Sequence, residues 1–108
     1  MTLEKATKIW QQISTSSQEK LRRDLVDRAV RYARIRVDWQ LTPKAERLDL
    51  ELSRTFAHNA LIDACSILTR AMLKAGEEIA WRYELGDDRK EIGDFACYLH
   101  AILGVAAR

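Results

Sequence analysis

Proline and glycine are scarce in this chain, which has one proline and four glycines among 108 residues. A β-sandwich or β-barrel joins many short strands through turns rich in these two residues, so the scarcity argues against a β-fold. Alanine, leucine, arginine and glutamate are frequent instead, and all of them favour helices. The composition therefore predicts an all-α fold, a compact bundle of about four helices.

Excess charge of one sign is also lacking. The chain has 18 Lys and Arg residues against 16 Asp and Glu, a net charge of +2. Such a balance does not describe a polycation built to hold nucleic acid. The 47% hydrophobic and 31% charged residues are typical of a globular protein. At this length we expect a single helical domain over residues 1–108.

Cysteines and long hydrophobic runs are few. Cys65 and Cys97 both fall in apolar helical patterns, which fits a reducing compartment better than a disulfide framework. The first twelve residues, MTLEKATKIWQQ, carry charges where a signal peptide needs an apolar core. The longest uncharged run, residues 95–107, is too short to span a bilayer. We therefore expect a cytoplasmic protein with no membrane partner.

Apolar periodicity and capping signals divide the chain into helices. The expected helices cover residues 2–13, 16–40, 43–75 and 88–106. Ser16 and Glu19 have the spacing of a capping box at the start of the second helix. Thr42 can cap the third helix, and Pro43 suits its first position. Gly76 is expected to end that helix in the left-handed conformation.

The third helix is too long for a compact domain. Residues 43–75 would form a rod about 50 Å long at about 1.5 Å per residue, whereas a domain of about 100 residues has a radius of gyration of about 13 Å. The rod must break or project into a partner, and a break is expected within residues 47–53, where leucines alternate with polar residues. Residues 77–86 are read as a short helix or connector that carries two aromatic residues into the core.

Three apolar stripes are expected to form the core. The stripe of the second helix consists of Leu21, Leu25, Ala29, Tyr32 and Ala33, with Val26, Val30 and Val37 widening it. The stripe of the third helix consists of Phe56, Ala57, Ala60, Leu61, Ala64, Ile67, Leu68, Ala71 and Met72. The stripe of the last helix consists of Ile92, Phe95, Ala96, Leu99, Ile102, Leu103 and Ala106.

Glu91 and Asp94 are the first candidate site residues. At positions i and i+3 they are neighbours on a helix and could share one divalent ion. Mg²⁺ binds a few carboxylates together with waters and phosphate oxygens. A helix start explains the same residues without a metal, because Asp88 and Glu91 have capping-box spacing and Asp94 lies near the positive end of the helix dipole. We expect the helix start.

The segment KEIGDFACYL, residues 90–99, resembles the second carboxylate motif of the MazG-like all-α nucleoside triphosphate pyrophosphohydrolases. In that family an E-x-x-D helix faces an E-x-x-E helix, and together they hold Mg²⁺ on the triphosphate. Glu91 and Asp94 match the motif. The preceding helix has Asn59 and Asp63, four apart, where the family has glutamates three apart. The resemblance implies Mg²⁺-dependent hydrolysis, with Glu91, Asp94 and Asp63 on the metal.

The second helix is basic, with seven Lys and Arg against two Asp between residues 20 and 36. Arginine pairs well with phosphate, so one face of this helix could contact nucleic acid. The residues of that face are Arg23, Arg28, Arg31 and Arg34. Several basic residues also have aspartates four positions away, which is typical of a solvated face with local ion pairs. We favour the solvated face.

Arg22 and Arg36 differ from the other arginines because they project toward the apolar side of the helix. An inward arginine needs a carboxylate partner. The candidate partners are Asp63, Glu91 and Asp94. In the hydrolase interpretation, Arg22 or Arg36 would instead contact phosphate.

Other polar residues predict no further site. Asn59, Asp63, Ser66 and Arg70 form a polar stripe on the third helix that we expect to be exposed. Cys97 and His100 are close enough to chelate one ion, yet no second pair at ligand spacing accompanies them, so zinc is not expected.

Two segments, HNALIDACSILTRAM at residues 58–72 and ELGDDRKEIGDFACYLH at residues 84–100, resemble a family of small all-helical bacterial proteins often associated with mobile genetic elements. The resemblance implies a cytoplasmic bacterial protein with a compact helical domain. It implies no activity and no cofactor.

The last helix suggests an interface, because Tyr98, Ala101 and Val105 lie opposite its main apolar stripe. A helix that is apolar nearly all round is central or covered by a partner, and Gly93 and Gly104 would allow close approach. Together with the long third helix, this predicts a homodimer with two-fold symmetry. Our leading hypothesis is a non-enzymatic module that binds protein partners without a cofactor. The alternatives are the Mg²⁺-dependent hydrolase and nucleic-acid binding.

Overall fold

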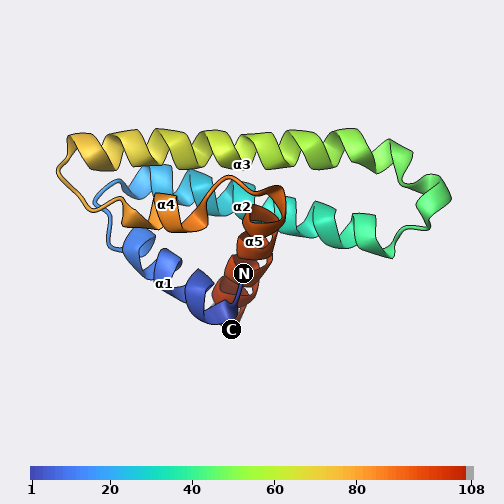
Figure 1. The fold of residues 1–108 in the computed structure, drawn as a ribbon, viewed down its shortest axis with the longest axis horizontal. Helices are drawn as coiled ribbons and strands as arrows, with labels where there is room; N and C mark the ends of the chain where they lie inside the picture. The colour runs from blue at the N-terminus through green and yellow to red at the C-terminus, as the bar shows by residue number, and fades with distance from the viewer. Residues whose placement is uncertain (107–108) are drawn as a thin grey trace.

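The structure is a computed structural model that describes the backbone of residues 1–106 and the side chains of residues 1–104. It is all-α, as the composition predicted (Figure 1). The elements are α1 (Leu3–Ser14), α2 (Glu19–Leu41), the 3-10 turn η1 (Lys44–Glu46), α3 (Leu48–Lys74), α4 (Ala80–Leu85) and α5 (Arg89–Ala106). Within the described residues, no helix is both long enough and apolar enough to cross a membrane.

The two longest helices form the frame of the fold. α2 and α3 run side by side in opposite directions, and α5 packs across the middle of α2 (Figure 1). α1 packs against both α4 and α5. The molecule measures 48 × 28 × 22 Å because the C-terminal end of α2 and the N-terminal end of α3 extend past the other helices. We call this projecting hairpin, residues 37–56, the arm.

α3 resolves the question of the long third helix. The expected break lies before the helix, at the turn η1, and α3 then continues without interruption for 27 residues, about 40 Å. The rod therefore projects instead of breaking within residues 47–53. At its other end Gly76 has φ +75°, as predicted. The amide of Gly76 donates to the Leu73 carbonyl (3.0 Å) and that of Glu77 to the Met72 carbonyl (2.8 Å), which is a Schellman motif.

The core lies where α2, α3 and α5 meet and continues toward α1 and α4. Its fully buried large side chains include Ile9, Ile13, Leu25, Tyr32, Leu61, Leu68, Met72, Trp81, Leu85, Ile92, Phe95 and Leu99. The main stripe predicted for the second helix is confirmed, although Val37, which was expected to widen it, is 46% exposed. In the last helix Ile92, Phe95, Ala96, Leu99 and Leu103 belong to the core or pack against it, and the side chain of Ala106 lies outside the described residues. Two residues of the third stripe are wrong, because Phe56 is 66% exposed and Ile67 is 41% exposed. Phe56 borders the groove between α2 and α3 without being buried in it.

The connector between α3 and α5 brings one aromatic residue into the core, not two. Trp81 is fully buried, whereas Tyr83 is 79% exposed. Residues two apart on a helix point to nearly opposite sides. The short helix α4 therefore buries one of the pair and leaves the other in solvent.

Two loops at the same end of the molecule are joined by Glu77. Its carboxylate accepts hydrogen bonds from the Ser16 hydroxyl (2.6 Å), the Ser17 hydroxyl (2.6 Å) and the Ser17 amide (2.9 Å). These hydrogen bonds lower the pKa of Glu77. The predicted capping box is wrong in detail, because α2 begins at Glu19 with Gln18 at the cap and no side-chain cap bond. Ser16 binds the distant Glu77 instead.

Candidate functional site

The acidic residues at the start of α5 have two different partners. Asp88 caps the helix, since its side chain accepts from the Lys90 amide at 3.1 Å. Glu91 does not complete a capping box. Glu91 Oε1 and Asp94 Oδ2 instead lie 3.0 and 3.1 Å from the α-ammonium group of Met1. The helix-start interpretation is therefore right for Asp88, while Glu91 and Asp94 bind a cation of the chain itself.

Arg36 reaches the same carboxylates from α2. Its Nη2 lies 2.9 Å from Asp94 Oδ1, so the predicted pairing of an inward arginine with Asp94 is confirmed. The guanidinium group lies directly over Gly93, where an added Cβ would be 2.8 Å from Arg36 Nη1 and 3.1 Å from Cζ. Gly93 was expected to let another helix approach, but it admits the Arg36 side chain. Arg36 Nη1 is also 3.9 Å from Cys97 Sγ.

Charges within this cluster balance. Burial alone would raise the pKa of Asp94, but hydrogen bonds from the Met1 ammonium and Arg36 outweigh it, so the net pKa is lowered. Hydrogen bonds to Glu91 and Asp94 raise the pKa of the Met1 amine above its usual 8.0. Two cations thus neutralise two carboxylates, and the cluster ties the start of the chain and α2 to α5.

The third proposed metal ligand lies elsewhere. Asp63 is exposed on α3 as part of the predicted polar stripe, in which Asn59 and Arg70 are also exposed and Ser66 is half-buried. In the described part of the chain, no three His, Cys, Asp or Glu side chains come together as a metal site. A divalent ion at Glu91 and Asp94 would have to displace the Met1 ammonium group.

Arg22 is not paired with a carboxylate as expected. Its Nη1 donates to the Ser14 carbonyl at 3.1 Å and so helps to close the turn between α1 and α2. Arg36 lies 14 residues further along α2, about 21 Å away at about 1.5 Å per residue. The structure therefore does not bring the two proposed phosphate-contacting arginines together.

The arginines of the proposed nucleic-acid face have separate surroundings. Arg23 pairs with Glu19. Arg28 lies 3.2 Å from Asp24 and donates to the Ala60 carbonyl at 2.9 Å, which ties α2 to α3. The other two, Arg31 and Arg34, are exposed. Arg31 lines the groove between α2 and α3, whereas Arg34 lines a hollow between α2 and α5.

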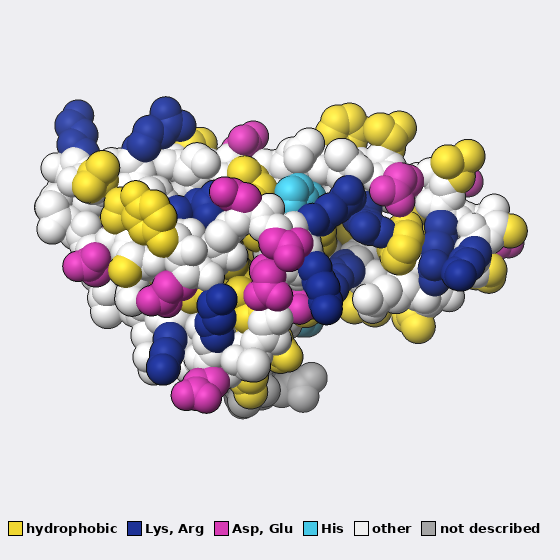
Figure 2. Space-filling model, in the orientation of Figure 1, with side chains coloured by type: hydrophobic (Ala, Val, Ile, Leu, Met, Phe, Trp, Pro, Cys, Tyr) yellow, Lys and Arg dark blue, Asp and Glu magenta, His cyan; other side chains and the backbone are white. Residues whose placement is uncertain are grey.

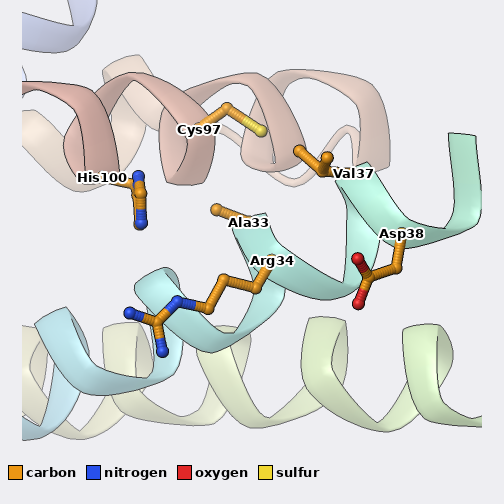
Figure 3. Close-up of a pocket in the computed structure, with 6 residues that line it drawn as sticks. All are labelled: Ala33, Arg34, Val37, Asp38, Cys97 and His100. Carbon is orange, nitrogen blue, oxygen red and sulfur yellow. The ribbon is translucent and has the colours of Figure 1, made fainter. Parts of the chain in front are cut away.

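That hollow between α2 and α5 has a volume of about 320 Å³ (Figure 3). Cys97 points from α5 toward Ala33 and Val37, while Arg34 and Asp38 extend from α2 away from the thiol (Figure 3). His100 lines the same hollow, but it is exposed. The hollow is mainly apolar near Cys97 and does not assemble a nucleophile with a base and an orienting group.

The outer side of α5 is less open than the sequence suggested. Tyr98 is half-buried and packs against the core, and Ala101 is exposed. A Cβ added at Gly104 would meet nothing within 4 Å. The side chain of Val105 lies outside the described residues.

The most exposed apolar surface lies instead on the arm, and sequence reasoning missed it. Its exposed large side chains are Val37 (46%), Leu41 (79%), Leu48 (83%), Leu52 (66%) and Phe56 (66%). Figure 2 shows apolar side chains at this end of the molecule, among charges of both signs. The spacing of Leu48, Leu52 and Phe56 at four-residue intervals was the available signal, because it places all three on one side of a helix.

The contact between Gly93 and Arg36 gives a testable prediction. Gly93→Ala should gain up to about 1 kcal/mol of helix propensity, yet the new Cβ displaces Arg36 from Asp94, which costs about 1.5–3 kcal/mol for a hydrogen bond between charged groups. We expect net destabilisation of the wild-type protein and stabilisation of the Arg36→Ala variant by the same substitution. Urea unfolding of the wild-type protein, the two single variants and the double variant measures this coupling. If Gly93→Ala changes the free energy of unfolding equally in the wild-type protein and in Arg36→Ala, the contact is contradicted.

Comparison with known proteins adds no family to this description: no family model matches the chain, and searches of curated proteins and of solved structures give no significant match.

Proposed function

We propose that this chain is a cytoplasmic, non-enzymatic helical interaction module that acts as a homodimer through the arm. The observation that carries the proposal is the exposed apolar surface of the arm, above all Leu48, Leu52 and Phe56 on α3. Five of the nine exposed large apolar side chains among the described residues lie in the arm; the other four, Leu3, Ile67, Leu73 and Tyr83, lie outside it.

The size of this surface fits the centre of an interface. The five exposed side chains of the arm present on the order of 500 Å² of apolar area, given 150–250 Å² for a large aromatic side chain and somewhat less for an aliphatic one. Monomeric proteins rarely expose contiguous patches larger than about 300–600 Å² without a functional reason. A standard interface buries about 800 Å² per partner, including a polar rim. The exposed apolar side chains of the arm would therefore supply the central part of such an interface, and the charged residues of the arm its rim.

The charge of the arm favours a second copy of the chain as the occupant. Residues 37–56 contain four acidic and three basic residues, so the arm is nearly neutral with both signs interspersed. Two copies can therefore meet around a two-fold axis without net repulsion, and acidic residues of one copy can face basic residues of the other. The arm has no electrostatic potential that would complement a strongly acidic or strongly basic partner.

The thiols support a reducing compartment as part of this proposal. Cys65 and Cys97 are both free, Cys65 is buried, and burial raises the pKa of its thiol to about 12. A protonated, buried thiol is inert and fits the cytoplasm. The bacterial origin implied by the resemblance belongs to the same proposal.

The hydrolase remains an alternative with less support. Glu91 and Asp94 are neutralised by Met1 and Arg36, and Asp63 lies on another surface. Nucleic-acid binding has similarly little support, because Arg23 and Arg28 pair with neighbouring acids.

The experiment that tests the proposed function is sedimentation equilibrium over a wide concentration range. We expect a reversible equilibrium between the 12.5 kDa chain and a species of twice that mass. The dimer should persist at moderate salt, because an apolar interface depends little on ionic strength. A single 12.5 kDa species up to millimolar concentration would overturn the proposal.

A further inference from the structure

A second surface, separate from the apolar patch, lies at the base of the arm. Three helices enclose a cavity of about 400 Å³ there. α2 contributes Tyr32, Arg36, Trp39 and Gln40, α3 contributes Arg54, and the start of α5 contributes Asp88, Arg89 and Lys90. Figure 2 shows Lys and Arg side chains gathered where the start of α5 meets α2 and α3. Cavities that bind small molecules have volumes of about 300–1,000 Å³.

The charges around this cavity do not balance. Its lining has four cationic side chains and one carboxylate, that of Asp88. Arg47 adds a fifth cation, since its guanidinium lies 4.3 Å from the centre of the Trp39 ring. The nearby carboxylates of Glu51 and Asp94 pair with cations of the lining. Five positive charges against three negative leave a positive excess in a half-open cavity, so the attraction to an anion is strongest at low ionic strength.

Two of the cations are also held loosely. Glu51 is 3.9 Å from Arg54 and 3.8 Å from Arg89, so one carboxylate serves two guanidinium groups at long range. Charge-assisted hydrogen bonds between such groups are about 2.7–2.9 Å long. Arg36, by contrast, is only 2.9 Å from Asp94 and is fully engaged. Arg54 and Arg89 therefore keep most of their donor capacity for another anion.

The cavity wall contains two buried donors without a protein partner. Neither Trp39 Nε1 nor Arg89 Nε has a hydrogen-bond acceptor among the described residues, although both atoms are shielded from solvent. A buried donor left unpaired costs about 1–3 kcal/mol. The guanidinium groups of Arg47 and Arg54 stack on the Trp39 ring, 4.3 and 4.1 Å from its centre. Both unpaired donors belong to residues that line the same cavity.

We propose that this cavity binds the phosphate monoester of a small hydroxylated molecule, such as a sugar phosphate. The terminal guanidinium nitrogens of Arg54 and Arg89 would donate to the phosphate oxygens, and arginine matches this group because it can donate two parallel hydrogen bonds. The cavity exceeds the volume of a phosphate alone. Gln40 and Asp88, both exposed at its edge, can accept from hydroxyl groups. Binding requires no metal, because the cations are supplied by the chain.

Isothermal titration calorimetry with ribose 5-phosphate, inorganic phosphate and ribose tests this site in metal-free, low-salt buffer. We expect ribose 5-phosphate to bind in the submillimolar range, inorganic phosphate to bind at least fivefold more weakly, and ribose not to bind. Arg89→Gln should weaken ribose 5-phosphate binding at least tenfold. Trp39→Phe keeps a ring at this position and removes an N–H that is shielded from solvent, so it should weaken binding less than Arg89→Gln does.

Arg31→Gln is the matched control. It removes one positive charge from an exposed arginine of α2 that lines a different groove, so it should change the affinity less than twofold. Circular dichroism establishes that each variant is folded. The proposal is overturned if no phosphate ester binds at 10 mM, if ribose binds as well as its phosphate, or if Arg31→Gln weakens binding as much as Arg89→Gln. Binding of single-stranded nucleic acid without binding of the sugar phosphate would also overturn it.

Discussion

Trp81→Ala is expected to lower the free energy of unfolding by about 3–5 kcal/mol, the usual cost of removing a large aromatic side chain from a core. Trp81 is fully buried, and its backbone amide donates to Gln12 Oε1 at 2.8 Å, which joins α4 to α1. A domain of this size has a total stability of about 5–15 kcal/mol. The loss is therefore at least a fifth of the total, and urea unfolding followed by circular dichroism measures it directly.

Two further variants test whether this loss of stability comes from the burial of the Trp81 side chain. Tyr83→Ala changes an aromatic residue of the same short helix that is 79% exposed, so it should change stability by no more than about 0.5 kcal/mol. Trp81→Phe keeps most of the apolar contact and removes Nε1, which is buried without an acceptor among the described residues. We expect it to cost clearly less than Trp81→Ala. Equal losses for Tyr83→Ala and Trp81→Ala would mean that α4 is not placed as described.

The double variant Leu52→Glu, Phe56→Glu should convert the proposed homodimer to a monomer. Truncating or replacing a hot-spot residue typically costs 2 kcal/mol or more in binding, about 30-fold in the dissociation constant. Two such changes, each present in both copies, should raise the dissociation constant at least 100-fold in sedimentation equilibrium. Stability of the protomer should change little, because both side chains are 66% exposed.

The control places the same two charges elsewhere. Leu73→Glu, Tyr83→Glu alters side chains that are 61% and 79% exposed and lie outside the arm. It adds the same net charge to each copy, so it shows how much of the effect is general repulsion. We expect this control to remain dimeric. If the control dissociates while the arm variant stays dimeric, a dimer exists but the arm is not its interface.

Local signals in the sequence were enough to predict most of the fold. Periodicity predicted the four main helices, and Gly76 adopts the left-handed conformation expected of it. The predicted caps at Ser16 and Thr42 are wrong, since α2 begins at Glu19 and α3 at Leu48, both without a side-chain cap bond. Which side of α3 is buried was not predictable from local signals. A helix of 27 residues with apolar positions on two sides has two candidate core faces, and only the packing of α3 on α2 decides which is buried. Phe56 and Ile67 were misassigned for this reason.

The acidic cluster was predictable in part. An arginine on the apolar side of a helix needs a carboxylate, and that rule named Asp94 as one of three candidate partners for Arg22 and Arg36. It holds for Arg36, which pairs with Asp94, but not for Arg22, which binds a carbonyl group. The contact of the Met1 ammonium group with this cluster was missed. The ammonium group belongs to the backbone, 93 residues from Asp94, and no pattern of side chains predicts its position. The same limit hid the phosphate cavity, whose lining comes from three separate helices.

The projection of the arm has a consequence for how the molecule opens. Toward the tip of the arm, beyond the start of α5, α2 and α3 pack mainly on each other and on η1, and α3 begins at Leu48 with Arg47 at its N-cap and no side-chain cap bond. Segments with few buried apolar contacts unfold locally at a lower free energy than the core. The arm should therefore fray while α5 and the middle of α2 stay intact. A partner that binds only the ordered arm would suppress this fraying by mass action. Order in the arm would then depend on the concentration of the protein itself.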